Sequence, residues 1–242
     1  MASRLRYWLS LEFPLLFWRR GLGRAGVILI LLSGAFPLLA DGGTNVLDND
    51  YAYIAPAPGT YTLPVIKPAG DGDLIDSRNH SLRLRDLTRG RVTVLSFIYT
   101  RCAAAKACPY ATGVLMQLHQ QSQEDPALAK GMRLVSISFD PAGDTPERMA
   151  AYSTLARTNG PAAEWQFVTT RSQAQLQPIL DSYGQAVDKR PNPNDPQGPL
   201  FHLLRVFLID SEGNIRNIYS SGTLDPRLVL ADVKTLLSKT AQ

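Results

Sequence analysis

Cysteine is nearly absent from this chain, which has two cysteines and three histidines among its 242 residues. Two cysteines allow one intramolecular disulfide at most, so a framework of several disulfides is excluded. The sequence also lacks a glycine-rich phosphate-binding loop, a Ser-His-Asp arrangement and a paired-carboxylate hydrolase site. The chemistry of the protein is therefore to be sought around its few sulfur and imidazole groups.

An excess of positive charge is missing from most of the chain, although the formal net charge is +4. Residues 1–40 contain five arginines and one glutamate, and the remaining residues contain 20 basic and 20 acidic side chains. Nucleic-acid binding depends on a basic surface that neutralises phosphates. We therefore expect no nucleic-acid partner for the domain that follows residue 40.

A long apolar run occurs at 25–40 (AGVILILLSGAFPLLA), directly after the arginine-rich segment. The pattern predicts that residues 1–40 form an N-terminal signal or membrane anchor. The run is shorter than the roughly 20 residues of a comfortable span, but we favour an uncleaved transmembrane anchor with the domain on the outer, periplasmic side. Cleavage would instead release the protein into the periplasm. Residues 41–60, rich in Gly, Pro, Asp and Asn, predict a flexible tether, and residues 61–242 predict the folded domain.

Apolar runs and turn residues predict an alternation of strands and helices after residue 61. Strands are predicted at 92–99, 133–139, 165–168, 203–209 and 215–219. Helices are predicted at 109–124, from Thr145 onward, at 172–183 and at 226–238. The proline-rich segment 190–196 predicts a loop. This alternation, with a dithiol after the first central strand, predicts a thioredoxin-like α/β fold with a central mixed β-sheet and helices on both faces.

Both cysteines lie between the strand at 92–99 and the following helix. Cys108 precedes Pro109, so we expect Cys108 at the cap or first turn of that helix. Unpaired amides and the helix dipole favour a thiolate there, which assists both metal ligation and disulfide exchange. The alternative is that Cys102 and Cys108 form a small structural clamp.

His202 is the histidine best placed to join the two sulfurs, because it follows the proline-rich loop at the start of a predicted core strand. By contrast, His80 lies in an early turn, and the helical spacing of His119 suits an exposed face. Two thiolates with one imidazole form a soft set of low coordination number that suits copper. Zinc would require a fourth ligand or a water.

Charged residues near the cysteines and His202 have structural as well as functional interpretations. Arg101 either lowers the pKa of the neighbouring Cys102 thiol or faces water, and Lys106 either approaches a sulfur or is solvated. Asp140 is a candidate to support the ligands from behind, although a strand-ending turn also explains it. Asp144 before Thr145 fits the start of a helix.

Several segments together resemble the Sco/SenC family of thioredoxin-fold copper chaperones, which serve assembly of the copper centre of cytochrome c oxidase. The resemblance covers most of residues 61–240. It is carried by segments similar to family motifs: FIYTRC at 97–102, CP at 108–109, SFDPAGDTPE at 138–147, WQFVTT at 165–170 and HLLRVFLID at 202–210.

The resemblance implies that Cys102, Cys108 and His202 are copper ligands and that Cys102 and Cys108 can form a redox-active disulfide. It implies a cytochrome c oxidase subunit, or another copper or thiol client protein, as partner. The chain departs from the family in placing five residues between its cysteines instead of three. Gly198-Pro-Leu-Phe also stands where Tyr-x-Val-Asp usually precedes the histidine. Such changes alter ligand angles and redox poise.

Our preferred hypothesis is a membrane-tethered copper chaperone that delivers copper to a respiratory oxidase, in preference to an enzyme. The alternative is a thiol–disulfide oxidoreductase in which Cys102 and Cys108 are catalytic and His202 tunes them. A binding module with a structural disulfide is a third class. A peroxidase using Thr100 and Arg101 would share the architecture, but adjacency in sequence alone does not establish that site.

Overall fold

The structure is a computed structural model that describes residues 53–240, with side chains described as far as Ser238. The predicted anchor at 1–40 and most of the predicted tether at 41–60 lie outside the described residues. Within residues 53–240, the helices are too short or too polar to cross a membrane.

Ten strands and six α-helices, with one short 3-10 helix, make up the described part of the chain. The strands are Lys67–Pro68 (β1), Asp73–Asp76 (β2), Ser81–Arg83 (β3), Val92–Ile98 (β4), Met132–Ser138 (β5), Glu164–Thr169 (β6), Val187–Lys189 (β7), Leu200–His202 (β8), Arg205–Ile209 (β9) and Asn214–Ser220 (β10). The helices are Leu84–Thr88 (α1), Cys108–Glu124 (α2), Pro126–Gly131 (α3), Pro146–Tyr152 (α4), Ser153–Ala156 (η1, the 3-10 helix), Gln173–Tyr183 (α5) and Pro226–Thr240 (α6).

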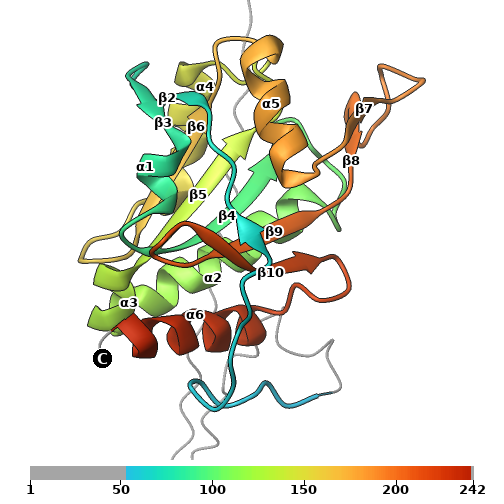
Figure 1. Cartoon of the computed structure of the whole chain (residues 1–242). Coiled ribbons are helices and arrows are strands. Elements are labelled where there is room, and N and C mark those ends of the chain that lie inside the picture. The colour runs from blue at the N-terminus through green and yellow to red at the C-terminus, as the bar shows by residue number, and fades with distance from the viewer. Residues whose placement is uncertain (1–52, 241–242) are drawn as a thin grey trace, which may run out of the picture. The chain divides into compact units, whose positions relative to one another are not determined.

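The main sheet has eight strands in the order β1-β10-β9-β4-β5-β6-β2-β3 (Figure 1). The central strands β4, β5 and β6 run parallel, whereas β9 and β2 join them antiparallel. Strands β7 and β8 form a separate two-stranded hairpin, which projects from the side of the main sheet in both views. The sheet is therefore mixed, as the sequence predicts.

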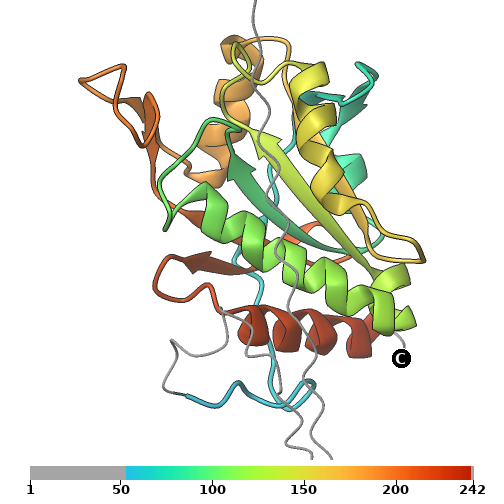
Figure 2. The ribbon, with the colours of Figure 1, turned by 180° about the vertical axis from the view of Figure 1, so that it is seen from behind.

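Helices cover both faces of this sheet. Figure 1 shows α1 and α5 in front of it, and Figure 2 shows α2 and α4 in front of the opposite face, with α6 beside α2. A sheet covered on both faces needs strands that are apolar along their whole length. Strand β4 comes close to this requirement: all seven of its residues are buried and five of them are apolar, the exceptions being Thr93 and Ser96.

The register of β4 and β5 determines where the functional residues lie. Val92 pairs with Met132, and Ile98 pairs with Ser138, so the two strands end side by side. The segments that follow them begin with Tyr99 and Phe139 and carry the first cysteine and the two predicted aspartates. The carboxyl ends of adjacent parallel strands are where α/β proteins commonly place their sites.

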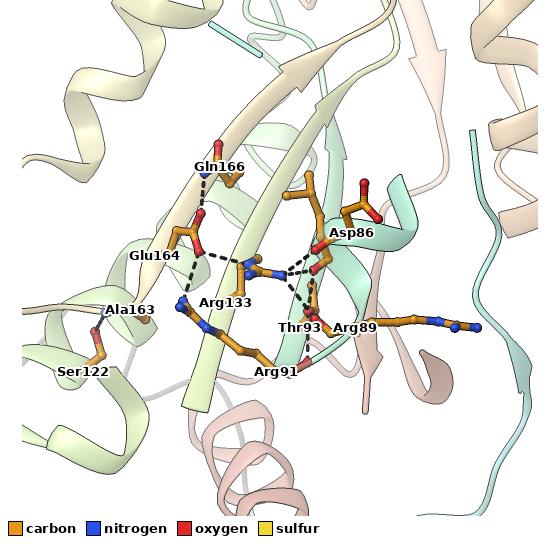
Figure 3. A network of polar contacts seen from close by, with 10 residues as sticks. Asp86, Arg89, Arg91, Thr93, Ser122, Arg133, Ala163, Glu164 and Gln166 are labelled. Carbon is orange, nitrogen blue, oxygen red and sulfur yellow. Dashed lines mark hydrogen bonds and ion pairs between the residues drawn. The ribbon is translucent and has the colours of Figure 1, made fainter. Parts of the chain in front are cut away.

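The opposite end of the same strands is held by a polar network around Arg133 (Figure 3). The Arg133 guanidinium donates from Nη1 to the Leu87 carbonyl at 2.8 Å and from Nε to Glu164 Oε2 at 3.1 Å. Arg91 Nη1 donates to the same Glu164 oxygen at 3.0 Å. This network joins α1, β5 and β6 far along the strands from the cysteines.

The structure corrects two details of the prediction. The predicted strand at 203–209 begins at Arg205, and His202 instead ends the separate strand β8. His119 is buried, with its ring 5.6 Å from that of Trp165, so the prediction of an exposed face was wrong. Burial of this ring lowers the pKa of His119.

Candidate metal and thiol site

Cys108 is the first residue of α2, with Pro109 directly after it. Proline suits the first turn because its fixed φ matches the helix, and because an amide hydrogen there would have no acceptor within the helix, so no hydrogen bond is lost. Cys108 is buried, whereas Cys102, in the loop before the helix, is half-buried. Both are free thiols in the structure.

His202 faces the Cys108 sulfur from the end of β8. Its Nε2 lies 3.3 Å from Cys108 Sγ, and its Nδ1 lies 3.0 Å from the Leu203 carbonyl oxygen. Because a carbonyl oxygen only accepts hydrogen bonds, Nδ1 carries the proton and neutral His202 keeps a lone pair on Nε2. The ring is also fixed by Phe139, at 4.5 Å between centroids. This nitrogen is thus presented to the thiol site as a metal ligand would be.

The two thiols differ in acidity. A hydrogen bond with the Cys108 side chain lowers the pKa of Cys102 to about 4, against the opposing effect of burial. The same hydrogen bond and the burial of Cys108 raise the pKa of Cys108. The pair therefore holds a thiolate at Cys102 and a protonated donor at Cys108, which is the asymmetry expected of a nucleophilic and a buried partner thiol.

This asymmetry predicts selective alkylation. At about pH 6, iodoacetamide should label Cys102 of the reduced full-length protein and leave Cys108 largely unmodified, since the thiolate is the nucleophile. The labelling rate should fall only as the pH drops through about 4, where Cys102 becomes protonated. Peptide mapping by mass spectrometry checks both statements. Preferential labelling of Cys108, or a Cys102 rate that keeps rising up to pH 9 as for an ordinary thiol, would contradict this assignment.

The five residues between the cysteines form a turn, and Cys108 remains in contact with His202 despite the length of this loop. Ala107 donates its backbone N–H to the Ala104 carbonyl at 2.9 Å, which closes a turn just before α2. Ala103 donates its backbone N–H to the Gln197 carbonyl at 3.3 Å, which joins this loop to the β7–β8 connection. The longer loop is thus compatible with the site.

Asp144 holds the base of the cysteine loop, a role that the sequence analysis missed. It is fully buried and accepts hydrogen bonds from Thr100 N at 3.0 Å, Thr100 Oγ1 at 2.5 Å and Ser138 Oγ at 2.6 Å. Helix α4 is capped by Thr145 instead. The sequence could have indicated this role. Adjacent parallel strands place the loops that follow them side by side, and Asp144 lies in the loop after β5 while Cys102 lies in the loop after β4.

Asp140 and Arg101 pair with each other. Arg101 Nη2 lies 2.7 Å from Asp140 Oδ2, so the guanidinium is directed to the carboxylate behind the loop. Two interpretations of Arg101 were predicted, an approach to the Cys102 sulfur and a purely solvated side chain. The ion pair with Asp140 corresponds to neither of them. Asp140 therefore supports the loop through Arg101, and Asp144 supports it through Thr100.

Within residues 53–240, no group of three or more His, Cys, Asp or Glu side chains stands ready as a metal-ligand cluster. The structure brings Cys102, Cys108 and His202 together: Cys108 Sγ lies 3.3 Å from His202 Nε2, and hydrogen bonds with Cys108 and with His202 both lower the pKa of Cys102. His80 is not near them, since it is exposed and its Nδ1 lies 3.2 Å from Asp76 Oδ2. A three-coordinate site would form if these two sulfurs and the His202 imidazole closed around an ion.

Gln185 helps to fix the position of the His202 side chain through the Leu203 carbonyl. Its side chain is buried, and its Nε2 donates to the Leu203 carbonyl at 2.9 Å, the same oxygen that accepts from His202 Nδ1. Gln185 follows Gly184, which ends α5 in the left-handed conformation at φ 61°. The turn after α5 thus carries a donor that fixes the carbonyl and, through it, the orientation of the imidazole.

This contact predicts that Gln185→Glu weakens copper binding, because a carboxylate of similar shape has no amide hydrogen to donate. Loss of a group that orients a ligand histidine typically costs about 10- to 100-fold in metal affinity. Cu(I) competition measures the affinity, and the ring ¹⁵N shifts of His202 report its tautomer. Gln173→Glu, at an exposed position at the start of α5, is the control. Wild-type affinity with an unchanged His202 spectrum in Gln185→Glu would rule out this positioning role.

A cavity of about 480 Å³ opens beside Cys102 and His202. Its lining comes from the cysteine loop, the long β7–β8 connection, β8 with the residues after it, and the residue that follows β10: Cys102, Ala104, Ala105, Lys106, Ala107, Arg190, Gln197, Leu200, Phe201, His202, Leu203, Leu204 and Ser221. Cys102 and His202 therefore share one opening to solvent, whereas the buried Cys108 does not line it.

Comparison with known proteins agrees with this fold. The family model described as SCO1/SenC matches residues 69–238, whereas no curated protein matches the chain. Copper-bound ScoI of Bradyrhizobium japonicum is 22% identical, with a TM-score of 0.55 over 70% of this chain and 99% of that chain. Copper-bound yeast Sco1 is 18% identical, with a TM-score of 0.53 over 68% of this chain and 87% of that chain.

BsSco, described as a member of the Sco family of cytochrome c oxidase assembly proteins with a disulfide switch, is 22% identical. The similarity has a TM-score of 0.55 and covers 72% of this chain and 96% of that chain. At such identities the solved structures establish the fold, and they confirm the predicted thioredoxin-like architecture. The family match spans well over half of the sequence, and the protein belongs to the SCO1/SenC family.

Proposed function

We propose that this protein binds copper through Cys102, Cys108 and His202 and delivers it to a cytochrome c oxidase during assembly. The observation that carries the proposal is the 3.3 Å approach of His202 Nε2 to Cys108 Sγ beside a cavity that Cys102 also lines. One thiolate, one thiol that loses its proton on metal binding, and one imidazole give a soft donor set that suits Cu(I).

The relatives support this assignment, since ScoI and yeast Sco1 are solved with copper bound and BsSco belongs to a family of oxidase assembly proteins. The proposal includes the N-terminal segment 1–40 as a membrane anchor that holds the domain on the periplasmic side. An open cavity beside the ligands suits cargo transfer, because a client ligand can approach before the copper leaves.

A thiol–disulfide oxidoreductase is the second candidate, and the unequal thiols favour it. The half-buried thiolate of Cys102 next to the protonated, buried Cys108 is an arrangement that attacks and then resolves a disulfide. In this mechanism Cys102 attacks a client disulfide, a mixed disulfide forms, and Cys108 displaces the client thiol. The product is a Cys102–Cys108 disulfide and a reduced client.

One experiment separates the two functions. The full-length protein loaded with Cu(I) is mixed with a purified copper-free oxidase copper domain, and copper transfer and client thiol content are both followed. Chaperone activity predicts transfer by the wild type and loss of transfer in His202→Ala. Reduction of the client without copper transfer, undiminished in His202→Ala, would favour the oxidoreductase and contradict the copper proposal.

A further inference from the structure

The mouth of the cavity beside Cys102 carries exposed apolar side chains on both sides of His202. Phe201 is 47% exposed and Leu203 is 56% exposed, although the two residues flank a buried histidine. Large apolar side chains held in water beside a reactive site commonly mark a surface that a partner covers. The β7–β8 hairpin that carries Phe201 also projects from the body of the domain, where a partner can reach it (Figure 1).

Apart from the Cys102 thiolate, the same mouth carries charge of only one sign. Among the residues that line it, Lys106 and Arg190 are the basic side chains, and the lining includes no aspartate or glutamate. Neither cation forms an ion pair among the described residues 53–240. Arg101 differs in this respect, because Asp140 neutralises it. Lys106 lies in the cysteine loop that is longer than in the family pattern.

Arg190 is held in place for an incoming group. Its Nη2 donates to Gln197 Oε1 at 3.1 Å, and its guanidinium lies 5.6 Å from the centroid of the Phe201 ring. Its Nε is buried and makes no hydrogen bond within the described part of the chain. A guanidinium with five donors that is fixed in orientation and has no acidic partner is suited to a carboxylate.

From these observations we propose that the mouth docks an acidic, cysteine-bearing segment of the client protein. The client carboxylate pairs with Arg190 and Lys106, and apolar client side chains cover Phe201 and Leu203. The client cysteine is thereby brought to Cys102. This proposal rests on the proposed function, in which a client thiol approaches the site, and it adds the chemistry by which the client is recognised.

The test uses three synthetic peptides whose cysteine is flanked by two glutamates, two glutamines or two lysines, each activated as a thiopyridyl disulfide. The Cys102 thiolate attacks the peptide sulfur and forms a mixed disulfide, while the bond to the pyridyl sulfur breaks and its electron pair leaves with thiopyridone. Release of thiopyridone gives the rate of this first step, and no further oxidant or reductant is consumed.

We expect the glutamate peptide to react about tenfold faster than the lysine peptide at low salt, with the difference shrinking at about 0.5 M salt. The double variant Lys106→Gln/Arg190→Gln should remove this order of rates. The matched control is Lys189→Gln, on the same hairpin but lining a separate cavity, which should retain it. Leu203→Ser should slow all three peptides alike.

Equal rates for the three peptides, or an order of rates that survives in the double variant, would overturn the docking proposal. A dimer of the full-length protein that dissociates in Leu203→Ser would assign the mouth to a second copy and also overturn it. Cu(I) affinity is measured on the same samples. Tight copper binding without peptide selectivity would overturn the docking proposal alone. Absence of copper binding by the wild type would overturn the proposed function.

Discussion

Replacing Cys102 or Cys108 by serine, or His202 by alanine, is expected to weaken Cu(I) binding by more than about a hundredfold. Changes to groups that merely orient a ligand already cost about 10- to 100-fold, so removal of a ligand should cost more. The expectation follows from the contact of His202 Nε2 with Cys108 Sγ and from the shared cavity that Cys102 lines. Competition with a Cu(I) chelator under anaerobic conditions measures each affinity.

The matched control for His202→Ala is His80→Ala. His80 is exposed in a turn, so its loss should leave Cu(I) affinity and stability near the wild-type values. An affinity in His202→Ala equal to that of the wild type would remove the histidine from the site. Weak binding by the wild type itself would remove copper from the function.

Asp144→Ala is expected to lower the free energy of unfolding by about 3 kcal/mol and also to weaken copper binding. The buried carboxylate accepts hydrogen bonds from Thr100 and Ser138, and its removal leaves their donors unpaired in the interior. Thr100 is two residues from Cys102, so the cysteine loop should lose its fixed position. Denaturant unfolding of the copper-free protein and Cu(I) competition measure the two effects.

Arg133→Leu provides the comparison for Asp144→Ala. Arg133 holds the opposite end of the strands through the Leu87 carbonyl and Glu164. Its replacement should cost about 2 kcal/mol of stability, since charge-assisted hydrogen bonds are lost, but should leave Cu(I) affinity unchanged. If Asp144→Ala destabilises the protein and binds copper as the wild type does, Asp144 is structural only and our assignment is incorrect.

The central elements were predictable because they are long and apolar. The runs at 92–99 and 133–139 correspond to β4 and β5, and the Cys108-Pro109 pair marks the start of α2, as observed. Strands β7 and β8 were not predicted. Each has three residues, too few for a periodic pattern, and they pair only with each other outside the main sheet.

The site was predictable in its residues but not in its supporting contacts. Cysteine and histidine are recognisable as candidate ligands from their residue type alone. The cysteines follow β4 and His202 ends β8, and the fold brings these segments together. The support from Gln185 has no sequence signal, because it depends on the turn after α5 approaching the Leu203 carbonyl from another part of the chain. The contact of Asp144 with the cysteine loop could have been predicted from the parallel pairing of β4 and β5. The contact of Gln185 with the Leu203 carbonyl is evident only in the tertiary structure.

The most direct test of a Cys102–Cys108–His202 copper site is X-ray absorption of the full-length protein carrying one Cu(I). We expect the Cu(I) ion of the wild type to have two sulfur neighbours and one nitrogen neighbour. The nitrogen should disappear in His202→Ala, and one sulfur should disappear in Cys102→Ser and in Cys108→Ser. Two sulfur neighbours without nitrogen in the wild type, or a nitrogen that persists in His202→Ala, would contradict the proposed site.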